Sequence, residues 1–273
     1  MPAVFYRDPG STYPAAVRAE GMYVHDNAGC RYLDMSGGAA VSSVGHGHPK
    51  VVSAVQEQVS ILAFAHTAFF TNEPQEQLAS RIAARFPEKG ARVWFTSGGS
   101  EANESALKVA WQYWRAKDKP EKTIVISRQF SYHGGTFGAT SISGSVYRRA
   151  PYEKVLLDWP RIAPCYAYRH QQTDESAEDY GRRAARELEQ AIWEAGADHV
   201  AAFIAEPVVG ATLGVVPPVP GYFEEIRRIC DDNEVLFIAD EVMCGSGRCG
   251  AFFTHAQTAS KRDVAQRCGP TCF

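Results

Sequence analysis

Apolar and β-branched runs alternate with stretches of helical period along most of this chain. Five runs are apolar along their whole length, and strands are predicted there: 92–96, 123–127, 154–157, 200–205 and 235–240. Amphipathic stretches predict helices at roughly 49–63, 75–86, 101–116, 176–195 and 220–232. Strands without polar alternation are typical of a sheet that is covered on both faces. The pattern therefore predicts an α/β fold with a mainly parallel sheet flanked by helices.

The chain before the first predicted helix has a different pattern. Residues 21–38 read GMYVHDNAGCRYLDMSGG, in which two aromatic strands flank a turn at 26–29. We therefore expect an N-terminal segment with a β-hairpin at 1–50, a large domain at 51–256 and an atypical tail at 257–273. The tail has weak hydrophobic periodicity, so we expect it to be disordered.

The composition is that of an ordinary globular protein. Of the 273 residues, 45% are hydrophobic and 22% are charged, which is enough for a sizeable core. A net charge of −3 gives no reason to expect nucleic-acid binding. No apolar run is long enough to span a bilayer, and the N-terminal stretch lacks a signal peptide's apolar segment, so we expect a cytoplasmic protein. The seven cysteines have no zinc-site spacing and are interpreted as thiols, so no metal site is predicted.

Small residues lie between the first predicted strand and its helix. In open α/β sheets ligands bind beyond the carboxyl ends of the strands, so these residues are candidates for a site. Gly98, Gly99 and Ser100 stand directly before the helix. Free amides at a helix start, with a serine hydroxyl beside them, make an anion site. The spacing fits neither a Walker A loop nor a dinucleotide motif, and a serine that only caps the helix after a tight turn is the alternative.

The other strand ends carry an aromatic pair and two acids. Tyr132 and His133 precede a glycine pair, where a flat ligand could stack or where an ordinary turn could lie. Glu206 directly follows one apolar run and Asp240 ends another, and a buried carboxylate needs a partner. Structural ion pairs or a helix cap are the competing explanation. Together these positions suggest a ligand with a phosphate, a flat ring and a ring nitrogen, which pyridoxal 5′-phosphate combines.

Five segments, in order along the chain, resemble the class III pyridoxal-phosphate-dependent aminotransferases of fold type I. They read GCRYLDMSGGAAVSSVGHGHPKV, TSGGSEANESALKVA, SYHGGTFGATSISG, IAEPVVG and IADEVMCGSGRCG. This family includes the ornithine, acetylornithine, 4-aminobutyrate and other ω-amino transaminases. The resemblance implies transfer of an amino group from a small-molecule amine, weakly indicated to be an ω-amino donor, to a 2-oxo acid.

The resemblance also implies a role for each residue that matches the family's motifs. Gly99 and Ser100 would bind the phosphate of pyridoxal 5′-phosphate, and Tyr132 would stack on the pyridine ring. Asp240 would pair with the ring nitrogen, and Val242 would pack on the opposite ring face. The other implied cofactor contacts are Gly98, which gives room, His133, which completes the tyrosine motif, and Glu206, near the ring substituents.

Two further segments are implied to lie near active sites. Residues 42–44 would lie near the substrate pocket. Residues 66–74 resemble the segment that reaches a neighbouring active site, because the family builds its sites across a homodimer.

The family's lysine is not found in its expected setting. The family uses a lysine downstream of the Asp-Glu-Val strand, usually in a Lys-Gly step after an apolar strand, to form a Schiff base and to move a proton. We expect neither that strand nor that step here, and the only lysine after Asp240 is Lys261, in a polar stretch. We interpret Lys261 as a solvated tail lysine. The family's C-terminal small domain is not found either.

We therefore predict no catalytic residue in these 273 residues and keep two hypotheses. In the first, the chain is an aminotransferase by descent, in a truncated or frame-shifted copy, with a related aminomutase or decarboxylase as a lesser alternative. In the second, it is a non-catalytic fragment or a pseudoenzyme, for which a homodimer is in question.

Overall fold

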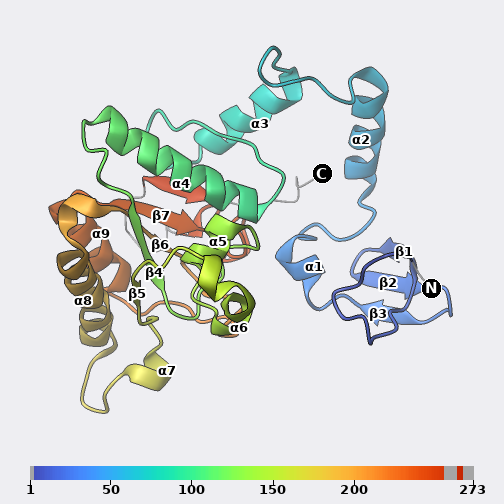
Figure 1. The fold of residues 1–273 in the computed structure, drawn as a ribbon. Coiled ribbons are helices and arrows are strands. Elements are labelled where there is room, and N and C mark those ends of the chain that lie inside the picture. The colour runs from blue at the N-terminus through green and yellow to red at the C-terminus, as the bar shows by residue number, and fades with distance from the viewer. Residues whose placement is uncertain (1–2, 255–262, 267–273) are drawn as a thin grey trace. The chain divides into compact units, whose positions relative to one another are not determined.

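The chain folds into two compact units, residues 1–72 and residues 73–273. The computed structural model describes residues 3–254 and 263–266. Figure 1 follows the chain from the N-terminal unit, in blue, through the second unit, in cyan to red. No helix among the described residues is long and apolar enough to cross a membrane.

The N-terminal unit is built on a small antiparallel sheet. Its elements are β1 (Ala16–Glu20), β2 (Tyr23–Asp26), β3 (Arg31–Leu33), α1 (Gly37–Ala40) and α2 (Pro49–Ile61). The predicted hairpin is confirmed as β2 and β3, while β1, which pairs with β2, was not predicted. The buried carboxylate of Asp26 accepts hydrogen bonds from the amides of Ala28 and Cys30 and from the hydroxyl of Tyr32, which fixes the turn.

The second unit contains all of the candidate cofactor residues. Its helices are α3 (Glu73–Ala83), α4 (Gly99–Ala116), α5 (Phe137–Ile142), α6 (Val146–Arg149), α7 (Ala167–His170), α8 (Ala177–Ala195) and α9 (Tyr222–Asp232), with 3₁₀ helices η1 (Ala150–Val155) and η2 (Ala197–His199). Its strands are β4 (Ile124–Arg128), β5 (Arg161–Ile162), β6 (Val200–Ala205), β7 (Leu236–Asp240) and β8 (Val264–Gln266).

The five strands form one parallel sheet in the order β5-β4-β6-β7-β8. On one face, α8 and α9 bury an apolar cluster that includes Ile126, Phe203 and Phe237. On the other face, α4 packs its stripe of Ala106, Leu107, Ala110 and Trp114 against alternate residues of the same strands. Figure 1 shows the sheet between these helices. Burial on both faces explains why the central strands are apolar throughout, and the predicted α/β fold is confirmed.

Two predicted strands are wrong. Residues 92–96 form no strand, and the side chain of Trp94 is 80% exposed. No strand of the described chain pairs with this run, and a strand needs a partner to satisfy its backbone groups. The run 154–157 overlaps the end of η1, and the strand that pairs with β4 on the side away from β6 is the two-residue β5.

One short strand lies inside the stretch 257–273, where no strand was predicted. A strand, β8, pairs in parallel with β7, and Asp240 lies opposite Gln266. Within the region 257–273, which was predicted to be disordered, the structure describes Asp263 and the three residues of β8. Residues 257–262, which include Lys261, and residues 267–273 lie outside the described residues.

Candidate functional site

The candidate site lies at the carboxyl ends of β4, β6 and β7. These neighbouring strands are parallel, so the residues that end or follow them come to one edge of the sheet. Asp240 ends β7, Glu206 follows β6, and the segment 131–135 follows β4 after a short turn. Position along the strands therefore brings together groups that are up to 109 residues apart, as the sequence predicts.

Asp240 is the most highly connected side chain of the site. Its Oδ2 accepts from Asn103 Nδ2 at 3.1 Å and lies 2.8 Å from His133 Nδ1, and its Oδ1 accepts from the amide of Val242 at 3.1 Å. Because an ionised carboxylate can only accept, Nδ1 of His133 carries the hydrogen. Both side chains are buried. A carboxylate has about four acceptor positions, so about one is left on Oδ1.

Asn103 is a site residue that the sequence analysis missed. It is 1% exposed, and besides the bond to Asp240 its Nδ2 donates to the backbone carbonyl of His133 at 2.6 Å. It lies on the apolar stripe of α4, one turn before Ala106 and Leu107. A polar residue at a core position of a helix needs buried partners, and that signal was available in the sequence.

Glu206 lies in a second buried pair, with Arg128 at the end of β4. The carboxylate Oε2 is 3.5 Å from Arg128 Nη2, and Oε1 accepts from the amide of Tyr132 at 3.2 Å. Burial raises the pKa of Glu206, and the neighbouring Arg128 and His133 oppose that rise. Arg128 was not predicted as a site residue either, because a charged residue at the end of an apolar run usually lies in solvent at the end of a strand.

The start of α4 provides unpaired amides. Gly98 precedes the helix in an extended conformation, and no described residue accepts from the amides of Gly99, Ser100 or Glu101. The hydroxyl of Ser100 instead accepts from the amide of Gly135 at 3.0 Å, so it ties α4 to the loop after β4. These amides and the positive end of an 18-residue helix suit an anion.

Glycines let these segments approach one another closely. A Cβ at Gly99 would lie 3.1 Å from both methyl groups of Val242, so Val242 packs on the first turn of α4. A Cβ at Gly134, which has φ +134°, would lie 2.5 Å from the Ser100 hydroxyl. The structure therefore brings the predicted residues Gly99, Ser100, Val242 and Asp240 to one place in the second unit.

Tyr132 is half-buried, and one face of its ring is covered. The guanidinium carbon of Arg148, on α6, lies 4.3 Å from the centroid of the ring. The predicted stacking of a cofactor ring on Tyr132 thus concerns the opposite face. Residues 42–44, predicted near the substrate pocket, belong to the N-terminal unit.

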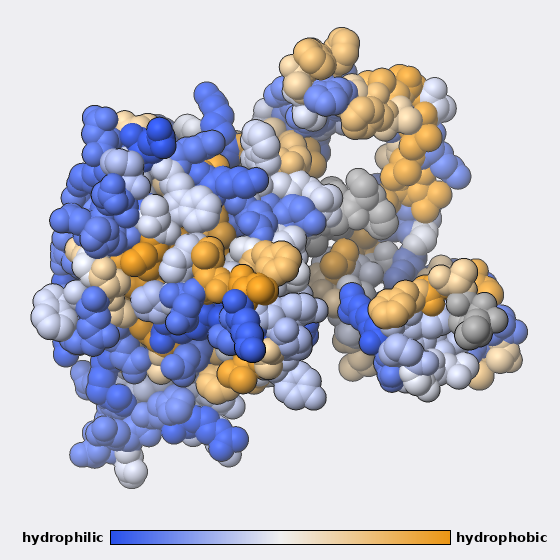
Figure 2. Space-filling model, viewed as in Figure 1, coloured by the Kyte–Doolittle hydropathy of each residue, from blue (hydrophilic) through white to orange (hydrophobic). Residues whose placement is uncertain are grey.

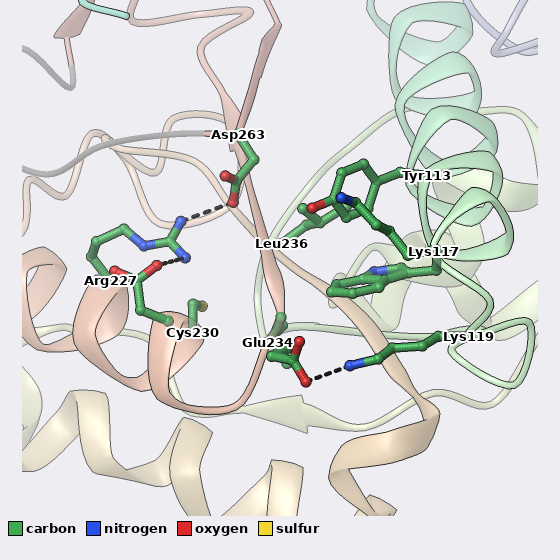
Figure 3. A pocket seen from close by; sticks show the side chains of 11 residues that line it. Tyr113, Lys117, Lys119, Arg227, Cys230, Glu234, Leu236 and Asp263 are labelled. Atoms are coloured by element: carbon green, nitrogen blue, oxygen red, sulfur yellow. Dashed lines mark hydrogen bonds and ion pairs between the residues drawn. The ribbon is translucent and has the colours of Figure 1, made fainter.

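A pocket of about 300 Å³ lies elsewhere, at the opposite end of the sheet. It is lined at the amino end of β7 by Leu236 and by charged side chains of α9 and the α4 end (Figure 3). Its acids are already paired, since Glu234 binds Lys119 and Arg227 bridges Asp231 and Asp263. It holds none of the predicted site residues, so we do not assign the function to it.

Comparison with known proteins gives the family. Residues 6–266 match the family model described as aminotransferase class-III. An uncharacterized aminotransferase of Schizosaccharomyces pombe is 40% identical over 262 residues, which are 96% of this chain and 57% of that protein. A putrescine–pyruvate aminotransferase of Pseudomonas aeruginosa is 40% identical over 240 residues, 86% of this chain and 52% of that protein. This chain thus spans little more than half of the length of these relatives.

The structural comparison agrees. The crystal structure of an omega transaminase from Pseudomonas jessenii in complex with PMP superposes with a TM-score of 0.91 at 31% identity, over 97% of this chain and 60% of that one. A thermostable (S)-enantioselective omega-transaminase from Thermomicrobium roseum gives 0.89 at 34% identity, over 96% of this chain and 60% of that one. Together with the family match across almost the whole sequence, these likenesses show that the chain belongs to the class III aminotransferases and has their fold type I architecture.

Proposed function

We propose that this chain is the cofactor-binding part of a pyridoxal-phosphate-dependent aminotransferase, which transfers an amino group from an amine to a 2-oxo acid. The proposal rests on one observation: a buried carboxylate and unpaired amides at a helix start lie at the same edge of the sheet. Asp240 keeps about one acceptor position on Oδ1, which suits a protonated ring nitrogen. The unpaired amides at the start of α4 suit the phosphate.

The residues present fit each part of this cofactor. Gly98, Gly99 and Ser100 would hold the phosphate, and Val242 would lie against one ring face while the free face of Tyr132 takes the other. When bound, the cofactor supplies a protonated pyridine ring that withdraws electrons from the carbon next to the substrate nitrogen.

The chain's own side chains would keep that ring protonated and in place. Asp240 would hold the proton on the ring nitrogen, because a charged carboxylate stabilises the cation. Asn103 and His133 hold Asp240 by hydrogen bonds to its other oxygen, which fixes the direction of Oδ1. Glu206 orders the loop after β4 through the amide of Tyr132.

We infer an ω-amino donor and a small 2-oxo acid acceptor. The support is the likeness to a putrescine–pyruvate aminotransferase and to omega transaminases, together with the sequence resemblance. A homodimer is part of the same proposal. The helix α2 buries no side chain within the N-terminal unit and exposes Val52, Val55, Val59 and Ile61 there. Figure 2 shows hydrophobic surface, in orange, along α2, and a second copy would cover it.

The lysine decides between catalysis and binding alone. A polypeptide of these 273 residues has Lys261 as its one lysine after Asp240. We propose that it binds the cofactor noncovalently and does not turn over, because Lys261 does not stand in the Lys-Gly step in which the family holds its Schiff-base amine. The test adds pyridoxal phosphate, reduces with borohydride and maps the label. A stoichiometric label on Lys261 together with amine-to-oxo-acid turnover would refute this part.

The cofactor site is tested with pyridoxamine 5′-phosphate, which has no aldehyde to react with surface lysines. Ser100→Asp places a negative charge at the first turn of α4, where it stabilises the helix but repels a phosphate. We expect at least a tenfold weaker affinity in a fluorescence titration, since charge-assisted bonds contribute ~1.5–3 kcal/mol each. Ser105→Asp, with the same added charge on the exposed side of α4, is the control. Equal affinities for the two variants would remove the phosphate assignment.

A further inference from the structure

The chain between β6 and α9 forms a small closed loop at residues 209–216, which we call the strap. The amides of Val209 and Val216 donate to each other's carbonyls at 3.0 and 2.9 Å, which closes the loop at its base. Within the strap, the amide of Gly214 donates to the carbonyl of Gly210 at 3.1 Å. Because these backbone groups are paired with one another, the strap has a fixed shape of its own.

The strap contacts the chain on both sides of the candidate site. On one side, the hydroxyl of Thr212 donates to the backbone carbonyl of Phe130, two residues before the tyrosine that would stack on the cofactor. On the other side, a Cβ added at Gly210 would stand 2.8 Å from the sulfur of Met243, the residue that follows Val242. The strap therefore joins the two segments that present the two walls of the proposed ring site.

Two residues at these contacts have strained backbones. Phe130 has φ +56°, and Val215, in the strap, has φ +67°. Bulky and β-branched residues adopt this left-handed conformation only where the surrounding structure holds them. Phe130 is held at both ends of its peptide unit, because its amide donates to the carbonyl of Gly144 and its carbonyl accepts from Thr212. Such strain is typical of segments whose exact position serves a site.

The bond from Thr212 adds to two other supports of Tyr132. The carboxylate of Glu206 accepts from the amide of Tyr132, and the guanidinium of Arg148 covers one face of its ring from α6. Arg149 in turn anchors α6, since it donates to backbone carbonyls at the end of α5. Thr212 holds the backbone just before the ring, from the side of β6.

We propose that the strap sets the spacing between the ring of Tyr132 and the side chain of Val242, with Thr212 as a positioning residue. Thr212 acts through the backbone of Phe130 and not by contact with the cofactor. This role rests on the proposed function and deepens it. A flat ring gains affinity from a slot whose width is fixed in advance, whereas a phosphate at the start of α4 does not depend on that width.

The first test needs no cofactor. Hydrogen exchange followed by mass spectrometry compares the wild type with Thr212→Val, which keeps the shape of the side chain but loses the hydroxyl. We expect exchange about two- to tenfold faster in peptides that cover residues 129–135, and wild-type exchange in Thr212→Ser. The matched control is Thr123→Val, because Thr123 also donates to a backbone carbonyl, at the other end of β4. Unchanged exchange in Thr212→Val, or equal acceleration of this segment in the control, overturns the proposal.

A titration then separates this proposal from the proposed function. The affinity for pyridoxamine 5′-phosphate should fall about two- to tenfold in Thr212→Val and recover in Thr212→Ser, while the affinity for inorganic phosphate stays at the wild-type value. Equal losses for the two probes would indicate a general loss of structure and would also overturn the proposal. A wild type that binds inorganic phosphate but not pyridoxamine 5′-phosphate would refute the proposed function, and the exchange measurement would still decide whether Thr212 holds the segment.

Discussion

Replacing Asn103 by alanine should destabilise the second unit strongly. The change removes the donor to the Asp240 carboxylate, a bond of ~1.5–3 kcal/mol, and leaves the buried carbonyl of His133 without that partner, at ~1–3 kcal/mol. Because the two losses share one amide group, we expect the free energy of unfolding to fall by about 3–5 kcal/mol in total. That is a large part of the ~5–15 kcal/mol that holds a typical domain together.

Urea unfolding followed by tryptophan fluorescence measures this effect selectively. All five tryptophans lie in residues 73–273, so the signal reports the unit that contains the site. The control is Ser105→Ala, on the exposed side of the same helix, where the lost bond goes to the carbonyl of Glu101 and alanine favours the helix. If the free energies of unfolding of Asn103→Ala and of this control agree within about 1 kcal/mol, the bonds that join α4 to His133 and Asp240 do not stabilise the unit as we infer.

Three other perturbations follow from the same structure. Gly134→Ala should disrupt the contact with Ser100 in the first turn of α4 and weaken cofactor binding. Gly135→Ala should not, because an added Cβ at that position has no atom within 4 Å. Equal cofactor affinities of the two variants in a titration would contradict the close approach. Burial raises the pKa of Glu206 above its ordinary 4.5, so its stabilising contribution is full below pH 4.5 and is lost as the pH rises through the raised pKa. Glu206→Gln should flatten that part of the stability–pH curve, and an unchanged slope would count against the raised pKa. Lys122→Met removes a buried ammonium that donates to two carbonyls and should cost about 2–4 kcal/mol in denaturation, far more than Lys119→Met at the surface; similar losses would refute the buried role.

The central strands could be predicted because burial on both faces requires apolar residues at every position of the strand. The runs 123–127, 200–205 and 235–240 became β4, β6 and β7 within a residue or so at each end. The equally apolar run 92–96 did not become a strand, since composition says nothing of whether a partner lies beside it. The two-residue β5 and the short β8 are too brief to give a period at all.

For a related reason, the sequence alone indicates only some of the residues that come together at the candidate site. Asp240 and Glu206 were found because acids at the ends of apolar runs are conspicuous. The groups that hold them, Asn103 and Arg128, come from other elements, and only the folded chain shows those contacts. The cover of Arg148 over Tyr132 likewise depends on how α6 is anchored, which no spacing in the sequence reveals.

The hydrogen bond between Asn103 and Asp240 joins residues 137 positions apart, and from this separation we expect a definite order of events in folding. Parallel strands joined by crossovers close long loops before their contacts stabilise anything, so such pairings form slowly. The helix α4 and the pair β4–β6 can assemble while β7 is still unformed, but the carboxylate of Asp240 is not yet in position at that stage. Binding competence should therefore appear last during refolding, after tryptophan burial, and a partly folded chain would have most of its secondary structure but no affinity for the cofactor.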